Sequence, residues 1–423
     1  MSSGALRIAV IGSGISGIVA AHLLQRRHAV TLFEKKSYVG GHTNTVNVDD
    51  GPDAGTPVDT GFIVCNDKTY PTFHRFLKDL GVRWRWADMS FGFHDETTGL
   101  QYAGTTLSGL FAQPVNALNP RFLHMLWEIR RFSRLALRDL GNHRLDRISL
   151  GWYLRRHRFG AGFIDNFIVP MGAAIWSTRA DRMLRFPAWT FIRFFKNHGL
   201  LELKDRPRWQ TIVGGSQSYV RAFLARFAGT VRLNARLAAV IRSESGVTIR
   251  HDDGHDEHFD QVVIAAHADE VLRVLGDPSP DERRLFGAWR YERNRVVLHT
   301  DEAVMPPNRR AWASWNYTRE ARADRGAALS MTYDMNRLQG LKTRRRYLVT
   351  LNRKGPIHES RVLREFHYRH PLYTTASIAT QPEIAALGGT NNTWFCGSYH
   401  GFGFHEDGAK SGAAVAAGFG VTL

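Results

Sequence analysis

The hydrophobic pattern at the start of the chain changes from strand-like to helix-like and back. Residues 7–11 (RIAVI) are a β-branched run, and the glycines of GSGISG separate them from IVAAHLLQRR, whose apolar residues have helical spacing. The run AVTLFEKK then predicts a second strand that ends at Glu34. A strand, a helix and a strand within about thirty residues predict one β-α-β unit.

The middle of the chain has the pattern of helices. Asn119 and Pro120 are typical of a helix start, and the sequence predicts a helix over 119–140. A further helix-rich stretch, dense in aromatic residues, covers 149–200, so we expect a helical part over about 119–200. One apolar stripe of the first helix consists of Phe122, Leu126, Ile129 and Phe132.

From residue 229 onward the pattern alternates as strands do, with turns at SESG and DDGHD. The run QVVIAA followed by HADEVLRVL predicts a strand that enters a helix. Strands that return so far from the first β-α-β unit indicate interleaved domains. Further strands are expected over 294–300, 311–319, 328–335, 346–352 and 393–399, and a last helix over 406–419.

Composition describes an ordinary globular chain. Hydrophobic residues make up 43% and charged residues 22% of 423 positions, which excludes a disordered or collagen-like chain. Two cysteines are too few for a disulfide framework. The N-terminal apolar run contains Arg7 and three glycines and has no cleavage site, so we expect folded structure rather than a signal peptide. A cytoplasmic location follows as the expectation.

The net charge of +17 would attract nucleic acid or an anionic membrane, although a solvated basic surface is the plainer alternative. No nucleic-acid module accompanies the charge, so we expect no nucleic-acid partner. The basic side of residues 121–138 and the run RRHR at 155–158 are compatible with peripheral contact with anionic phospholipids at the inner face of the cytoplasmic membrane. For that helix the pattern slightly favours the alternative, a core stripe with a solvated basic face.

A nucleotide fingerprint lies between the first two predicted strands. Gly12 allows a tight turn, Gly14 lets a pyrophosphate approach the backbone, and Gly17 lets helix and strand pack closely. The helix N-terminus offers free N–H groups and positive potential to phosphates. Glu34 can accept hydrogen bonds from ribose hydroxyls, so the sequence predicts a dinucleotide site.

Two features favour a flavin over nicotinamide. The pair Gly40-Gly41 follows Glu34 closely, as in the flavoprotein version of the fingerprint. Near the end, WFCGSYHGFGFHEDGAKSG predicts a strand, a turn and a helix whose N-terminus can face the flavin ring. Cys396 precedes the turn glycine and is expected to pack in the strand, so we expect FAD to be bound non-covalently.

These motifs resemble the FAD-dependent amine oxidase and phytoene desaturase-like superfamily over essentially the whole chain. The sequence is most similar there to a bacterial family of predicted NAD/FAD-binding proteins related to the flavoprotein portion of plant cyclopropane fatty acid synthases. The matching stretches include IAVIGSGISGIVAA, EKKSYVGGHTNTV, VDTGFIVCN, MGAAIWST, GGSQSYV and GSYHGFGFHEDGAKSG.

The resemblance implies an α/β fold, in which a Rossmann-type FAD-binding domain is interleaved with an α+β substrate domain containing a mixed sheet and a helical subdomain. The FAD-binding domain is expected over 1–75, 203–285 and 385–423, and the substrate domain over 76–202 and 286–384. His42 stands where many amine oxidases have arginine, and no lysine can be assigned to the position that holds a water near the flavin. The histidine puts a fixed positive charge at that position in question, and the lack of an assignable lysine weakens an amine as the substrate.

The family's cofactor contacts carry over to individual positions of this chain. The resemblance places the diphosphate at Gly12, Gly14, Ile15, Ser16 and Gly17, the adenosine ribose at Glu34 and Lys35, the pyrophosphate and ribityl at Gly40, Gly41, His42 and Thr43, the flavin ring beside Gly61, Phe62 and Ile63, adenine at Leu237, the second phosphate position at Gly397 and Ser398, and the helix under the ring at Glu406, Asp407 and Ala409.

Candidates for chemistry lie near the expected ring. His400 and His405 are candidates for a general base and Tyr399 for a further catalytic group, while a hydrogen-bonded structural role is the alternative for each histidine. The tract HDDGHDEH at 251–258 is expected to be a solvated turn, so no metal site is predicted. Aromatic residues expected to wall a substrate pocket, with core packing as the alternative, are Trp176, Trp315, Tyr317, Tyr333, Tyr373, Phe402 and Phe404.

The expected function is an FAD-dependent oxidoreductase that dehydrogenates a fatty acyl chain of a lipid by hydride transfer to flavin N5. The lipid substrate is implied by the family and not by the residues. Two alternatives stay open: a redox-neutral isomerase of acyl double bonds, and a flavin-binding accessory subunit of a lipid methyltransferase, which would make that methyltransferase a partner.

Overall fold

A parallel sheet forms the first half of the molecule. The structure, a computed structural model, describes residues 4–141, 145, 147–202, 204–321 and 330–423. The strands of this sheet lie in the order β10-β2-β1-β14-β20, and every pairing is parallel. They are β1 (Arg7–Ile11), β2 (Ala29–Phe33), β10 (Thr230–Arg232), β14 (Gln261–Ile264) and β20 (Thr393–Phe395).

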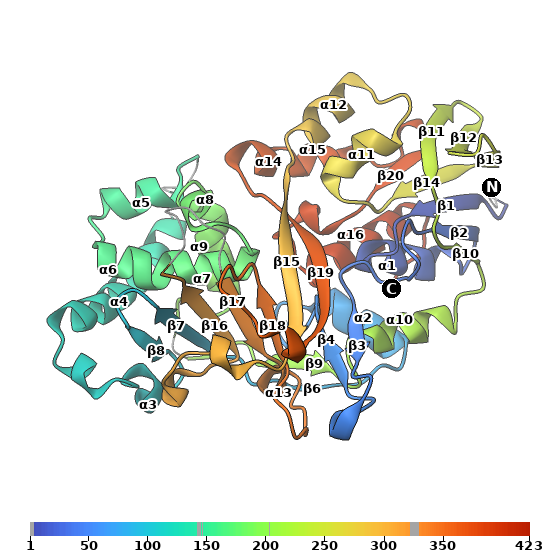
Figure 1. Cartoon of the computed structure of the whole chain (residues 1–423). Coiled ribbons are helices and arrows are strands. Elements are labelled where there is room, and N and C mark those ends of the chain that lie inside the picture. The colour runs from blue at the N-terminus through green and yellow to red at the C-terminus, as the bar shows by residue number, and fades with distance from the viewer. Residues whose placement is uncertain (1–3, 142–144, 146, 203, 322–329) are drawn as a thin grey trace.

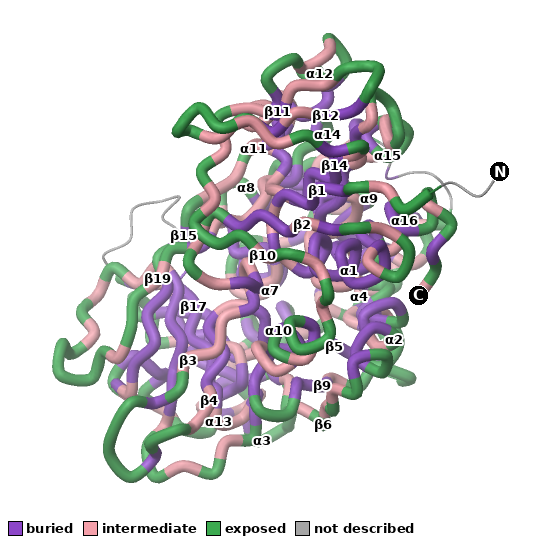
Figure 2. The backbone as a smooth tube through the Cα atoms, turned by 90° about the vertical axis from the view of Figure 1, so that its right-hand side faces the viewer, coloured by how far each residue is buried: buried purple, intermediate pink, exposed green. Residues whose placement is uncertain are grey.

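The central strands are apolar along almost their whole length because both faces of the sheet are covered. Helix α1 (Ile15–Leu24) is buried at every residue, and α16 (His405–Gly418) packs beside it. Figure 2 shows β1, β14 and α1 as a buried centre. Nearby lie α2 (Pro71–Asp79) and α10 (Gln217–Leu224).

A mixed sheet forms the second half, with the order β19-β15-β18-β17-β16-β7-β8. Its one parallel pairing among the described strands joins β16 to β7, with Trp315 opposite Phe91, so an early segment extends a sheet built mostly from the last third of the chain. The strands are β7 (Phe91–Asp95), β8 (Gln101–Ala103), β15 (Tyr291–His299), β16 (Trp315–Arg319), β17 (Ser330–Asp334), β18 (Leu348–Leu351) and β19 (Val362–Pro371).

Helices gather beside this sheet, at the left of Figure 1. Asn119 caps the longest of them, because its side chain accepts hydrogen bonds from Arg121 N and Phe122 N. The helices of this part are α3 (Leu107–Leu110), α4 (Pro120–Leu140), α5 (Leu150–Arg156), α6 (Ala161–Phe163), α7 (Val169–Trp176), α8 (Ala180–Met183) and α9 (Ala188–Asn197).

Smaller elements complete the described fold. One short sheet pairs β3 (Thr45–Asn47) with β4 (Pro57–Asp59). A second has the order β5 (Cys65–Asn66), β9 (Trp209–Ile212) and β6 (Trp84–Trp86). A third has the order β11 (Leu237–Ser243), β12 (Gly246–His251) and β13 (Asp256–Phe259). The other helices are α11 (Ala268–Val274), α12 (Pro280–Gly287), α13 (Met335–Leu338), α14 (Thr375–Ala379) and α15 (Gln381–Ala386).

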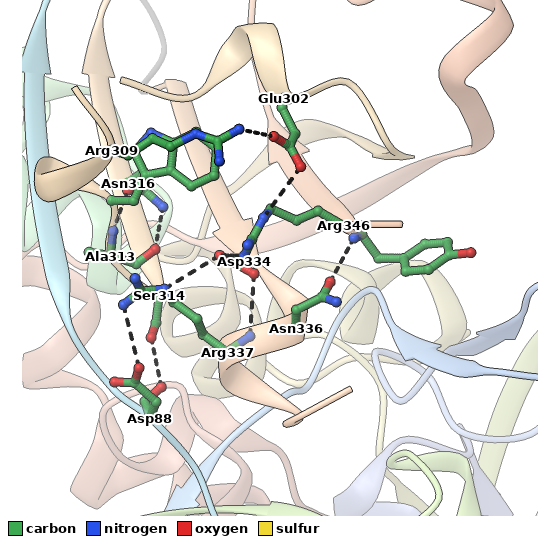
Figure 3. A network of polar contacts seen from close by, with 12 residues as sticks. Asp88, Glu302, Arg309, Ala313, Ser314, Asn316, Asp334, Asn336, Arg337 and Arg346 are labelled. Carbon is green, nitrogen blue, oxygen red and sulfur yellow. Dashed lines mark hydrogen bonds and ion pairs between the residues drawn. The ribbon is translucent and has the colours of Figure 1, made fainter. Parts of the chain in front are cut away.

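A buried polar network fixes one end of the mixed sheet (Figure 3). Asp334 is fully buried at the end of β17 and pairs with Arg346 and Arg337. Ser314 Oγ donates to Asp88 O at 2.7 Å, which ties the start of β16 to the segment before β7. A carboxylate removed from water in this way is stable only with such partners, so the network sets the position of β16 and β17.

The predicted α/β class with a mixed sheet is confirmed, and the strands of the two large sheets fall within the two sets of ranges expected for the domains. The expected strand over 311–319 is shorter, since only Trp315–Arg319 is extended; residues 328 and 329 of another lie outside the described part. The tract 251–258 is the tip of the β12–β13 hairpin, where Arg250 pairs with Asp256. None of the described helices has the length and hydrophobicity of a membrane-spanning segment.

Candidate active site

A single cavity of about 1330 Å³ connects the two halves of the molecule. One part is lined by the loops that follow β1 and β2, and another by residues of the mixed sheet and the helical part. Small-molecule pockets usually have about 300–1,000 Å³, so this cavity has room for a large cofactor and a second molecule.

The loop after β1 combines tight packing with open space. A Cβ atom on Gly12 would lie 2.7 Å from Ala265 O, and one on Gly17 would overlap Gly12 O. A Cβ atom on Gly14 would meet nothing within 4 Å. Gly14 precedes α1, whose N-terminus has no side-chain cap. Free N–H groups beside open space are what a diphosphate needs.

The loop after β2 closes on the first loop. Gly40 N donates to Ser13 O at 3.1 Å, and a Cβ atom on Gly41 would lie 3.0 Å from Gly14 Cα. Glu34 is buried in the cavity wall, where its carboxylate accepts from Ser13 N at 3.1 Å and Lys36 N at 2.8 Å. These hydrogen bonds hold the carboxylate in place and leave it capacity to accept from a ligand hydroxyl.

The C-terminal helix brings the end of the chain to the same place. A Cβ atom on Gly408 would lie 2.7 Å from Ile15 Cγ2, and one on Gly412 would overlap Ser16 O. The two glycines therefore allow α16 to lie directly against the first turn of α1. Gly397 and Ser398, before α16, consequently join the cavity wall.

Buried polar atoms without partners also suit the binding of a polar ligand. Among the described residues, His42 Nε2 and His267 Nδ1 are buried and make no hydrogen bond. Both rings line the cavity, with centroids 5.5 Å apart. Burial lowers the pKa of each to about 3, so both rings are neutral near pH 7. Because buried polar atoms normally have partners, the site fits a polar cofactor, although His42 supplies no fixed positive charge.

The predicted catalytic residues have different surroundings. His405 lines the cavity, stacks on Phe62 at 3.5 Å, and has its Nε2 3.1 Å from Thr43 Oγ1. Burial lowers the pKa of His405 well below its ordinary value, which keeps the ring neutral. Tyr399 also lines the cavity, and its buried hydroxyl has no partner among the described residues. His400 lies outside the cavity wall, and burial lowers its pKa to about 4.

Several predicted cofactor residues stand behind the wall. Glu406 accepts from Thr72 N at 3.0 Å and Phe73 N at 2.9 Å, at the N-terminus of α2. Asp407 accepts from Phe402 N and Phe404 N, and burial raises its pKa to about 7. The predicted cofactor residues that do not line the cavity are Gly17, Thr43, Ala409, Glu406 and Asp407. The predicted cofactor residues that line it are Gly12, Gly14, Ile15, Ser16, Glu34, Lys35, Gly40, Gly41, His42, Gly61, Phe62, Ile63, Leu237, Gly397 and Ser398.

The aromatic residues predicted for the substrate pocket come together with one exception. Tyr317 lies outside the cavity wall and stacks on Phe93 at 5.9 Å, inside the core of the mixed sheet. Trp315, which lies opposite Tyr333, is two residues before Tyr317 in β16 and therefore on the same face of the sheet, so these residues differ in their position along the strands and not in the face they occupy. Cavity-lining members of the set are Trp176, Trp315, Tyr333, Tyr373, Phe402 and Phe404.

Sequence reasoning missed one part of the cavity, which we call the apolar limb. Its residues come from α3, α4 and α7 and from the short π-helix Ile164–Ile168 between α6 and α7, and each is only partly buried because the cavity exposes it. A helical stripe in the sequence signals the apolar side of α4, but not whether that side meets the core or a cavity. The apolar limb consists of Leu110, Leu126, Ile129, Phe167, Met171 and Ile175.

The fold and site define a flavoprotein of the two-domain, dinucleotide-binding class. Residues 15–418 match the family of flavin containing amine oxidoreductases, so the chain belongs to that family and is an FAD-dependent oxidoreductase. The residues around Gly14, Glu34 and His42 would hold the FAD.

Individual proteins are similar to this chain in sequence or in fold. The protein AofH of Mycobacterium tuberculosis, which its name describes as a flavin-containing monoamine oxidase, is 27% identical over 340 residues, covering 78% of this chain and 70% of AofH. A fatty acid isomerase from P. acnes has a similar fold, with a TM-score of 0.68, 16% identity, and coverage of 99% of this chain and 100% of the isomerase. Cyclohexylamine oxidase from Brevibacterium oxydans IH-35A also has a TM-score of 0.68, with 14% identity and coverage of 98% and 100%.

Proposed function

We propose that the protein oxidises a fatty acyl chain of a lipid. The observation that carries this proposal is the apolar limb, which continues the same cavity that holds the cofactor residues. Aliphatic and aromatic side chains surround it, and these match the surface of a hydrocarbon chain. An acyl chain that fills the limb would displace water from apolar surface and extend toward the cofactor.

The charges of the wall argue against an amine. Among the described lining residues, the carboxylates are Glu34 and Glu270. Glu34 is bonded to backbone N–H groups, and Glu270 pairs with Lys35 at 2.8 Å. Both therefore belong to the nucleotide part of the site. An alkylammonium ion in the apolar limb would lose its hydration without meeting a negative charge, which is costly.

The chain's own residues would exclude water and orient the substrate. FAD, when bound, supplies a two-electron acceptor. Dehydrogenation removes two hydrogens from neighbouring carbons and leaves a double bond, and oxygen or another electron carrier takes the electrons afterwards. Tyr373 and Trp315 each present a buried polar atom without a partner among the described residues, Tyr373 OH and Trp315 Nε1, and these could orient a polar group of the lipid.

A second candidate is redox-neutral isomerisation of an acyl double bond. The fold shared with a fatty acid isomerase favours it, since that architecture accommodates a fatty acid. The residues that line the cavity are compatible with both reactions, because both need an acyl chain held against the cofactor in a dry site.

Anaerobic titration of the purified FAD protein with phospholipids, free fatty acids and alkylamines tests the proposal. Lasting loss of the visible flavin absorption with an acyl lipid, together with a new double bond by mass spectrometry, supports dehydrogenation. Product formation without lasting bleaching supports isomerisation. Bleaching by alkylamines alone refutes an acyl substrate, as does the absence of both bleaching and product formation with all of these compounds, and the latter result agrees with an accessory subunit of a lipid methyltransferase.

A further inference from the structure

The most exposed apolar side chains of the described structure lie close together in the sequence. Leu118, Leu107 and Val115 are 85%, 78% and 69% exposed, and no other large hydrophobic residue in the described part is as exposed. Leu123 and Trp127 follow on α4, at 42% and 54%. Single exposed leucines are common, but a group of this kind marks a site of interaction. We call these five residues the apolar rim.

Two residues of the apolar rim belong to the cavity wall. Leu123 and Trp127 are at once exposed at the surface and part of the cavity wall. Leu110, one turn after Leu107, also lines the cavity. The rings of Phe111 and Phe122, 6.1 Å apart, hold the end of α3 against the start of α4. The apolar limb therefore opens at the rim, and Figure 1 shows α3 and α4 at the opposite end of the molecule from the parallel sheet.

Positive charge accompanies the rim. Residues 104–134 contain four arginines and one carboxylate, Glu128. Glu128 is buried and accepts from Gly160 N at 2.8 Å. Arg121, Arg130 and Arg134 are exposed, and no described carboxylate pairs with them. The surface around the cavity mouth is thus apolar at its most exposed points and cationic beside them.

The side chains at the rim have the amphipathic character of residues at a membrane interface. Arg131 lies over the ring of Trp127, with its guanidinium carbon 5.6 Å from the ring centre. Tryptophan and arginine both combine an apolar body with a polar end, which suits the boundary between headgroups and acyl chains. Each arginine near an anionic membrane surface contributes about 1 kcal/mol to binding.

We propose that the apolar rim inserts into the headgroup and upper acyl region of an anionic phospholipid bilayer. The bilayer matches the rim in both apolar surface and charge. A second copy of this chain would bring Arg121, Arg130 and Arg134 against their own counterparts if it docked symmetrically. Docking on the bilayer would place the mouth of the apolar limb against the lipid, so that an acyl chain could enter without crossing water. This delivery of substrate rests on the proposed function, whereas the docking does not.

Flotation of the FAD-loaded protein with vesicles tests the docking without any measurement of activity. The vesicles are phosphatidylcholine alone or phosphatidylcholine with phosphatidylglycerol, at low and high salt. We expect binding to the anionic vesicles that weakens as salt rises. The double variant Leu107→Glu/Leu118→Glu should lower the partition coefficient at least tenfold, and Arg134→Gln about fivefold, which is the loss of about 1 kcal/mol.

A matched control is Leu224→Glu/Leu233→Glu, which adds the same charge at leucines that are 39% and 42% exposed away from the rim. This variant should bind within about twofold of the wild type, because charges farther than a Debye length from the bilayer are largely screened, and therefore far better than the rim variant. FAD content and circular dichroism show whether each variant is folded. Absence of binding to anionic vesicles at low salt, or an equal loss in the rim and control variants, overturns the proposal.

The oligomeric state of the wild type and the rim variant provides a second test of the proposal. If light scattering shows a dimer that the rim variant converts to a monomer, the rim is an interface between two copies and the proposal is wrong. If the rim variant and the wild type have the same mass and only the rim variant leaves the vesicles, the surface is a membrane-docking surface. Loss of docking with intact flavin bleaching by dispersed lipid would leave the proposed function standing.

Discussion

Substituting Gly14 by valine separates cofactor binding from folding. Gly14 has φ −68° and ψ 175°, an extended conformation that valine adopts readily, and nothing lies within 4 Å of a Cβ atom there. The folded chain therefore has room for the new side chain. The two methyl groups of the valine side chain would occupy the space in front of the N-terminus of α1, where the diphosphate of FAD is expected.

The size of the effect follows from the hydrogen bonds that would be lost. A hydrogen bond from a backbone N–H to a charged group contributes about 1.5–3 kcal/mol. If valine displaces the diphosphate from two such donors, the cost is about 3–6 kcal/mol, or a Kd raised by about a hundredfold to ten-thousandfold. Gly17→Ala is the contrasting variant, because its Cβ atom would overlap Gly12 O and damage the folded state itself.

The assay is thermal unfolding of the apo and FAD-loaded proteins, together with titration of FAD by fluorescence. Wild type should gain about 2.7 kcal/mol when free FAD reaches one hundred times its Kd. Gly14→Val should unfold at the temperature of the wild-type apoprotein without FAD and gain at most about 0.4 kcal/mol from the same FAD, whereas Gly17→Ala should unfold earlier even without FAD. A Gly14→Val protein that binds FAD with wild-type affinity would refute the placement of the diphosphate.

Three further predictions concern the same site. Burial raises the pKa of Asp407 to about 7, so the folded chain holds an extra proton between about pH 4 and pH 7 and loses stability as the pH rises through that range. In Asp407→Asn the amide oxygen can still accept from Phe402 N and Phe404 N, so the Tm of this variant should fall less than that of wild type across the same pH range. Parallel plots of Tm against pH for the two proteins would contradict this prediction. Glu34→Gln should weaken FAD binding about tenfold or more, since one end of the amide would present N–H groups to Ser13 N or Lys36 N, and an unchanged Kd in a fluorescence titration would argue against it. Met171→Trp should fill the apolar limb and lower kcat/KM at least about tenfold for long acyl chains but not for short ones, with FAD content unchanged; equal effects on both chain lengths would count against the limb as the acyl site.

The local part of the site could be predicted from the sequence because its signals are local. Gly12, Gly14 and Gly17 lie within six residues, and the change from strand to helix spacing surrounds them, so the turn and its ligand follow from backbone sterics. The same holds for the cap of α4 at Asn119, which one side chain provides. The resemblance to a known family added the prediction that the C-terminal segment belongs to the cofactor site. The glycines of this segment are explained by the tertiary structure, in which they allow α16 to lie against α1.

Contacts between distant segments were decided by the tertiary structure. Tyr317 and Tyr333 lie on paired strands and look alike in the sequence, but only Tyr333 lines the cavity. The register places Tyr333 opposite Trp315 and Tyr317 opposite Met331, so both tyrosines lie on one face of the sheet and only their positions along the strands separate them. His400 and His405 likewise lie five residues apart in the sequence, but only His405, at the start of α16, lines the cavity.

The sequence by itself determined the dinucleotide loop and its acidic partner, since neighbouring residues fix a turn through their own dihedral angles. Only the tertiary structure decided that this loop, the apolar limb and an exposed apolar rim share one cavity. Apolar residues at helical spacing are equally suited to a core, a cavity wall or a surface, and the choice among these depends on what packs against them from elsewhere in the chain.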